Sequence, residues 1–125
     1  MRMVGIAVAV LMSMGAARAE RVVASGQPLI LFQASATNPD CTSMGKIILR
    51  MTQAPQHGRV TIRSAGVFPN FAESNIRSAC NRRRVPGIQA VYVSQRGYLG
   101  PDFVELQALF PAGTERSLKL SISVK

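Results

Sequence analysis

Residues Ser117–Val124, with the sequence SLKLSISV, decide the fold class, because apolar and polar side chains alternate along them without a break. The aliphatic residues from Leu118 to Val124 fall on one side of an extended chain, whereas the serines and Lys119 fall on the other. A period of two is typical of a β-strand with one face in a core and the other in solvent. The segment therefore predicts a half-buried strand.

Six further segments upstream have strand character and are separated by turn-forming residues. In Asp102–Phe110 aliphatic residues alternate with Glu105 and Gln107, and the linker Pro111–Thr114 that follows is short enough for a hairpin. The other segments are Arg21–Ala24, Leu29–Ala34, Lys46–Thr52, Arg59–Arg63 and Ile88–Val93. Seven short strands without a long helix predict an all-β, antiparallel sandwich of two sheets.

The segment near residues 64–87 interrupts this pattern, because it is too long for a hairpin turn and shows no alternation. Asn70 followed by Glu73 resembles a helix N-cap with an acid three residues later. One face of two helical turns would then carry Ala72, Ile76, Ala79 and Cys80. We therefore expect an irregular or short-helical insertion in the sandwich.

Three short motifs in the second half of the chain resemble those of bacterial cadherin-like and immunoglobulin-like repeat domains. They are PQHGRV at Pro55–Val60, GYLGPDFV at Gly97–Val104 and LKLSISV at Leu118–Val124. The resemblance covers one copy, over Met51–Lys125 apart from the insertion. It implies an immunoglobulin-like or cadherin-like β-sandwich of the kind found in exported and surface proteins, where such domains serve adhesion or spacing.

Structural roles are expected for three polar residues of these motifs. Asp102 can accept hydrogen bonds from nearby backbone amides and fix the entry to its strand. Tyr92 and Tyr98 can supply bulk to the core while their hydroxyl groups lie at its edge. These residues are expected to stabilise the fold rather than to bind a ligand.

The first nineteen residues have the features of an export signal. Arg2 supplies a positive charge, Val4–Gly15 is an apolar run, and Ala17–Ala19 places small residues at the −3 and −1 positions of a cleavage site. A membrane-spanning helix needs about 20 apolar residues, and this run is shorter. We therefore expect cleavage after Ala19, a mature domain of residues 20–125 without a transmembrane segment, and a periplasmic or secreted location.

Composition narrows the class of protein further. The chain has 125 residues with a hydrophobic content of 47%, which excludes a multidomain enzyme and a disordered tail. It carries 15 Lys and Arg against 6 Asp and Glu, a formal charge of +9. Loss of Arg2 and Arg18 with the signal leaves 13 basic and 6 acidic residues, or +7. A basic domain of this size favours acidic partners or an anionic surface.

Cys41 and Cys80 are the two cysteines of the chain, and export predicts that they form a disulfide. A redox pair is usually spaced C-x-x-C, and a zinc site needs four ligands at short spacings. Here only His57 could supply a further zinc ligand, and the acidic residues are too dispersed for calcium. We therefore expect no metal and no cofactor.

The sequence shows no arrangement typical of a catalytic site. His57 is the only histidine and lies in a Pro/Gly turn without a local nucleophile. Asp102 and Glu105 are three residues apart on one predicted strand, so their side chains point to opposite faces. The chain also lacks a glycine-rich phosphate loop. The sequence therefore predicts a protein that is not an enzyme.

A basic cluster in the insertion is the one candidate binding site. Arg77, Arg82, Arg83 and Arg84 fall within eight residues, and guanidinium groups bind phosphate, sulfate and carboxylate through paired hydrogen bonds. The alternative interpretation is a solvated loop that aids solubility. Aromatic residues are not interleaved with these arginines as in nucleic-acid readers, so we expect no specific nucleic-acid binding.

Two functional hypotheses remain. The first is a small exported, non-catalytic structural or binding module of the cell envelope, whose partner is an unknown protein or an envelope surface. The alternative is a protein that binds polyanions, such as lipopolysaccharide, acidic polysaccharide or anionic lipid, through Arg77 and Arg82–Arg84.

Overall fold

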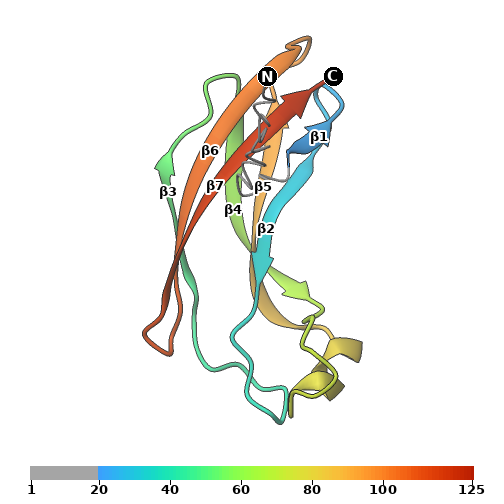
Figure 1. Cartoon of the computed structure of the whole chain (residues 1–125), viewed down its shortest axis with the longest axis vertical. Coiled ribbons are helices and arrows are strands. Elements are labelled where there is room, and N and C mark those ends of the chain that lie inside the picture. The colour runs from blue at the N-terminus through green and yellow to red at the C-terminus, as the bar shows by residue number, and fades with distance from the viewer. Residues whose placement is uncertain (1–19) are drawn as a thin grey trace, which may run out of the picture.

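The computed structural model describes residues 20–125, and the predicted export signal lies outside them. The described residues form an all-β sandwich of two sheets, as predicted (Figure 1). Its strands are β1 (Arg21–Val23), β2 (Leu29–Ala34), β3 (Ile48–Gln53), β4 (Gly58–Val67), β5 (Val85–Ser94), β6 (Gly100–Leu109) and β7 (Glu115–Val124). A 3-10 helix, η1 (Ser78–Arg82), lies between β4 and β5.

One sheet has the strand order β1-β7-β6-β3 and the other has the order β2-β5-β4. Neighbouring strands are antiparallel, except that β1 runs parallel to β7, with Arg21 beside Ile122 and Val23 beside Val124. A fully antiparallel sandwich was expected. The difference arises because the turn after β1 crosses from one sheet to the other instead of closing a hairpin between β1 and β2.

The core lies between the two sheets and is built from the alternating residues that the sequence predicts to face inward. On β5 and β6 the side chains of Ala90, Tyr92, Val104, Leu106 and Ala108 are at most 1% exposed. On β7 only Ile122 and Val124 are fully buried. Leu118 and Leu120 pack against this core while remaining partly exposed. The strict alternation of the last strand therefore predicts its inward face correctly.

The strands that flank the insertion are longer than the sequence predicts. β4 continues beyond Arg63 to Val67, and β5 begins at Val85 rather than Ile88. At Gly87 a Cβ atom would lie 2.5 Å from a methyl group of Val67 and 2.6 Å from the carbonyl oxygen of Ala34. Glycine therefore permits the close approach of three chain segments where local propensity indicates a break.

The insertion, residues 68–84, is irregular apart from the short helix η1, as predicted, but the expected helical face is wrong. Ile76, which was expected on the buried side, is 74% exposed. Asn70 does not cap a helix, because η1 begins at Ser78. The amide of Asn81 instead accepts a hydrogen bond from the backbone N–H of Phe71 (2.8 Å) and donates one to its carbonyl oxygen (2.9 Å). The backbone at Phe71 is therefore held by a side chain ten residues away, and not by the regular backbone hydrogen bonds of a helix.

A disulfide between Cys41 and Cys80 joins the insertion to the segment between β2 and β3, which confirms the predicted pairing. The Cα atoms of the two cysteines lie 5.5 Å apart. Such a bond fits an oxidising compartment. In Figure 1 the two joined segments lie together at the lower end of the sandwich, away from β1 and the C-terminus.

Candidate functional site

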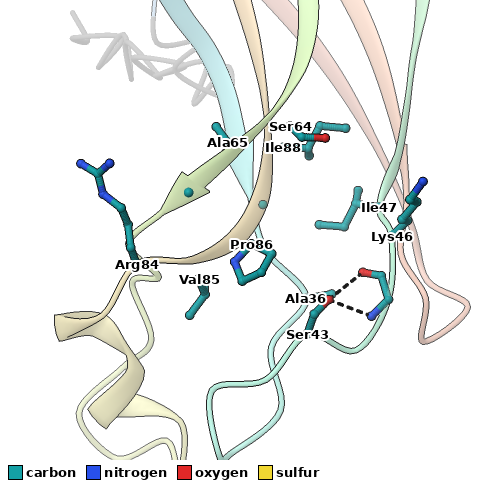
Figure 2. A pocket seen from close by; sticks show the side chains of 13 residues that line it. Ala36, Ser43, Lys46, Ile47, Ser64, Ala65, Arg84, Val85, Pro86 and Ile88 are labelled. Carbon is teal, nitrogen blue, oxygen red and sulfur yellow. Dashed lines mark hydrogen bonds between the residues drawn. The ribbon is translucent and has the colours of Figure 1, made fainter.

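A groove of about 860 Å³ opens between the two sheets toward the end that carries the disulfide (Figure 2). One wall comes from Lys46 and Ile47, which precede β3. The opposite wall comes from the end of β4 and the start of β5, at Ser64–Gly66 and Arg84–Ile88. Figure 2 shows β4 and β5 curving away from β3 at this point. The groove is therefore the place where the two layers of the sandwich separate.

Small residues keep this space open. Ala36, Ala65, Gly66 and Gly87 line the groove, and none of them has a side chain long enough to reach the opposite wall. Ile47, which is 9% exposed, supplies a larger apolar side chain of the lining together with Val85, Pro86 and Ile88. A concave, mainly apolar surface with few polar groups is the usual form of a ligand site.

Two cations stand on opposite sides of the groove, Lys46 before β3 and Arg84 before β5 (Figure 2). The stem of Arg84 lies over Gly66, where an added Cβ would be 3.1 Å from its Cδ. The guanidinium carbon of Arg84 lies 5.5 Å from the centroid of the Phe68 ring, a cation–π distance. The lining residues include no aspartate or glutamate. The groove therefore combines an apolar floor with positive charge.

The predicted cluster of four arginines is divided among different surroundings. Arg77 is half-buried, and its Nε donates a hydrogen bond of 2.8 Å to the carbonyl oxygen of Thr37, so it holds the insertion against the segment before β3. Arg84 borders the groove with its stem, while its guanidinium lies over the Phe68 ring. Arg82 and Arg83 are exposed at the end of η1, and Arg82 borders a separate hollow with Glu73. Arg77 thus has a structural role that the sequence did not indicate.

His57 makes packing contacts. Its ring lies parallel to that of Tyr98, with centroids 4.0 Å apart, and the Tyr98 hydroxyl donates to the carbonyl oxygen of Pro101 at 2.6 Å. Within residues 20–125 no three His, Cys, Asp or Glu side chains lie together as a metal site requires. No helix in this part of the chain is long and apolar enough to cross a membrane.

Sequence reasoning missed Lys46 and the small residues of the groove. The sequence predicts that Lys46 is the first residue of a strand and that Ser64–Gly66 begin the insertion. Only the separation of the two sheets, which depends on contacts between distant segments, brings them opposite Arg84.

Together the fold and this surface define a disulfide-closed β-sandwich with a positively charged, apolar groove. Comparisons with protein-family models, with curated proteins and with solved structures find no match for the chain.

Proposed function

We propose that the chain is an exported, non-catalytic binding module of the cell envelope, similar to immunoglobulin-like and cadherin-like domains, and that it binds a protein partner at the groove. The observation that carries this proposal is the groove itself, whose apolar floor lies between Lys46 and Arg84.

The strand order supports the resemblance to immunoglobulin-like domains. Constant-type immunoglobulin domains have the B, E and D strands adjacent in one sheet and the C, F and G strands adjacent in the other. Here β2, β5 and β4 are adjacent in one sheet, and β3, β6 and β7 are adjacent in the other. If β2 is named strand B, then β3 to β7 become strands C to G. The order of strands B to G within the two sheets is then the same as in the immunoglobulin domain.

Export is supported by two independent features. The signal-like pattern of residues 1–19 provides a route across the membrane, and the Cys41–Cys80 disulfide fits the oxidising compartment at the end of that route.

The binding function is tested by photo-crosslinking in the intact envelope. A photoreactive amino acid replaces Ser64, on the groove side of β4, or Ser117, an exposed residue on the outer face of the other sheet, as the matched control. We expect adducts of discrete mass from position 64 and not from position 117. Equal crosslinking from both positions would contradict the proposal.

Polyanion binding remains the second candidate, because Arg82, Arg83 and Arg84 are exposed and consecutive. Neutralising anionic groups releases counterions, so such binding weakens steeply with salt. We expect the triple variant R82A/R83A/R84A to elute from immobilised heparin at clearly lower salt than the unchanged protein. An R50A/R116A/K119A variant, which removes three exposed charges from the other sheet, serves as the control, and an equal loss in both variants would indicate a nonspecific charge effect.

A further inference from the structure

The four edges of the two sheets differ in how well they are protected. β1 has 3 residues, and the pairings of β2 and β3 contain register shifts, between Ile30 and Phe32 and between Met51 and Gln53. β4 has 10 residues and pairs with β5 without a shift over its full length. Short or bulged edges resist pairing with a further strand, whereas a long regular edge is a template for it. Among the described strands, β4 has the edge that is open to addition.

Within residues 20–125 the inward face of β4 is left without a cover. Ile62 pairs with the fully buried Ala90 and faces the interior, yet it is 37% exposed because no other described strand lies beyond β4. Two and four residues further along the same face, Ser64 and Gly66 line the groove. A strand added to β4 would place its inward side chains over Ile62 and then into the groove. Apolar side chains suit those positions.

The outward face of β4 carries Arg59 and Arg63. Nε and Nη2 of Arg63 donate hydrogen bonds of 3.3 and 3.1 Å to Oε1 of Gln89. Gln89 is a neutral partner, so these bonds leave the charge of Arg63 unbalanced. β2, β4 and β5 contain no aspartate or glutamate, so this sheet does not balance the two charges itself. Acidic side chains on an added strand would lie beside them and stabilise the pairing.

A second copy of β4 is a poor occupant of this edge. If two β4 strands paired antiparallel about Thr61, Arg59 of one copy would lie opposite Arg63 of the other. Like charges directly opposite each other destabilise a strand pair. The arginines therefore select against self-association and in favour of an acidic strand.

We propose that the protein partner binds by adding an extended segment to the free edge of β4, and that this segment alternates apolar residues, which face the groove side, with acidic residues, which face Arg59 and Arg63. This inference rests on the proposed binding function and names its mode and the chemistry of the partner. Backbone hydrogen bonds along β4 would supply affinity, and the alternating side chains would supply specificity.

Synthetic peptides test this mode on the processed, exported protein. The probe is a ten-residue peptide of alternating Val and Glu, compared with its Val/Lys counterpart and with a Val/Glu peptide N-methylated at alternate residues. We expect the Val/Glu peptide to bind at least tenfold more tightly than either control in calorimetric titration. Hydrogen exchange should slow in β4 when it binds. Equal affinity for the N-methylated peptide would overturn strand addition.

The second part of the experiment reverses the charges of Arg59 and Arg63 on the protein. We expect R59E/R63E to prefer the Val/Lys peptide, R59K/R63K to keep the original preference, and R82E/R83E to behave as the unchanged protein. The lysine variant guards against misfolding through loss of the contact from Arg63 to Gln89. An unchanged preference in R59E/R63E, or its loss only in R82E/R83E, would overturn the proposal, as would a β4-linked dimer that excludes the peptide.

The two levels of the proposal can fail separately. Discrete adducts from position 64 together with no preference for the Val/Glu peptide leave the binding function standing and overturn strand addition. Absence of adducts together with absence of peptide binding overturns both.

Discussion

The carboxylate of Asp102 ties the turn before β4 to the start of β6. It is 8% exposed and accepts hydrogen bonds from the backbone N–H groups of Gln56 (3.0 Å), His57 (3.1 Å) and Phe103 (2.9 Å). The Tyr92 hydroxyl adds a fourth bond of 2.7 Å. Burial, followed by this bond, raises the pKa of Tyr92, so its hydroxyl stays a donor. The acceptor role predicted for Asp102 is thus confirmed.

Stability should therefore fall in acid through Asp102. Burial raises the pKa of this carboxyl, but the bonds from Tyr92 and the backbone amides outweigh burial, so its pKa lies below the ordinary value of 3.8. A carboxyl of this kind contributes stability that is present above its unfolded pKa of about 4 and is lost as the pH falls through its folded pKa. We expect the urea midpoint of unfolding to drop as the pH falls from about 5 to about 2, the range in which Asp102 becomes protonated.

The matching substitution is Asp102→Asn, which keeps the shape but removes the charge and one acceptor oxygen. We expect a loss of about 2 kcal/mol in unfolding free energy at pH 7, because hydrogen bonds to charged groups are the strong ones. Asp40→Asn is the control. Asp40 also accepts bonds, from the backbone and hydroxyl of Thr42, but it is exposed and water replaces those bonds readily. Similar losses in both variants would contradict the role given to Asp102.

Among the elements, the two segments joined by the disulfide depend most on single contacts. The insertion meets the segment before β3 through Cys41–Cys80 and through the bond from Arg77 to the Thr37 carbonyl. Closing a loop with a sequence separation of 39 restricts the unfolded chain and is worth about 4 kcal/mol.

The double variant C41S/C80S should accordingly lose up to about 4 kcal/mol of unfolding free energy. Amide exchange should quicken mainly in residues 35–45 and 68–84, because β5, β6 and β7 keep their pairings. Hydrogen exchange followed by mass spectrometry checks this distribution. Uniform acceleration through the whole sandwich would show that the disulfide stabilises the entire fold rather than its lower end.

The elements also show what local sequence can and cannot predict. Alternation identifies β6 and β7, because each buries one face against a core and pairs over its whole length. The ends of β4 and β5 escape detection, since Ser64–Gly66 and Val85–Gly87 consist mainly of residues that local propensity assigns to loops. Their pairing, Ala65 with Gly87 for example, is fixed by neighbours such as Val67 and Ala34, which are distant in sequence.

At the scale of the whole molecule, the candidate site is less predictable than the fold. The arginine run is visible in the sequence, but the roles of its members depend on what lies beside them: Thr37 for Arg77 and Phe68 for Arg84. The open edge of β4 depends on the strand order of the sheet. Neither property is encoded within a window of neighbouring residues.

Processing after Ala19 is expected to leave the whole sandwich intact, because β1 begins at Arg21. Mass spectrometry of the exported protein should give a chain that starts at Glu20 and carries one disulfide. Bulky residues at positions 17 and 19 should block cleavage and retain the longer chain in the membrane fraction. Recovery of the unprocessed chain in the exported fraction would contradict this expectation.

The parallel pairing of β1 with β7 has a mechanical consequence. Because β1 and β7 run parallel, with Arg21 beside Ile122 and Val23 beside Val124, the chain enters β1 at one end of the pair and leaves β7 at the other end. A tension applied between the two ends would slide these strands past each other and load their hydrogen bonds together, rather than opening them one after another. Lys125 extends this pairing, since its N–H donates a hydrogen bond to the carbonyl oxygen of Val23 and its carbonyl oxygen accepts one from the N–H of Ser25. We therefore expect this pair to resist stretching of the chain better than a pair whose hydrogen bonds open one at a time.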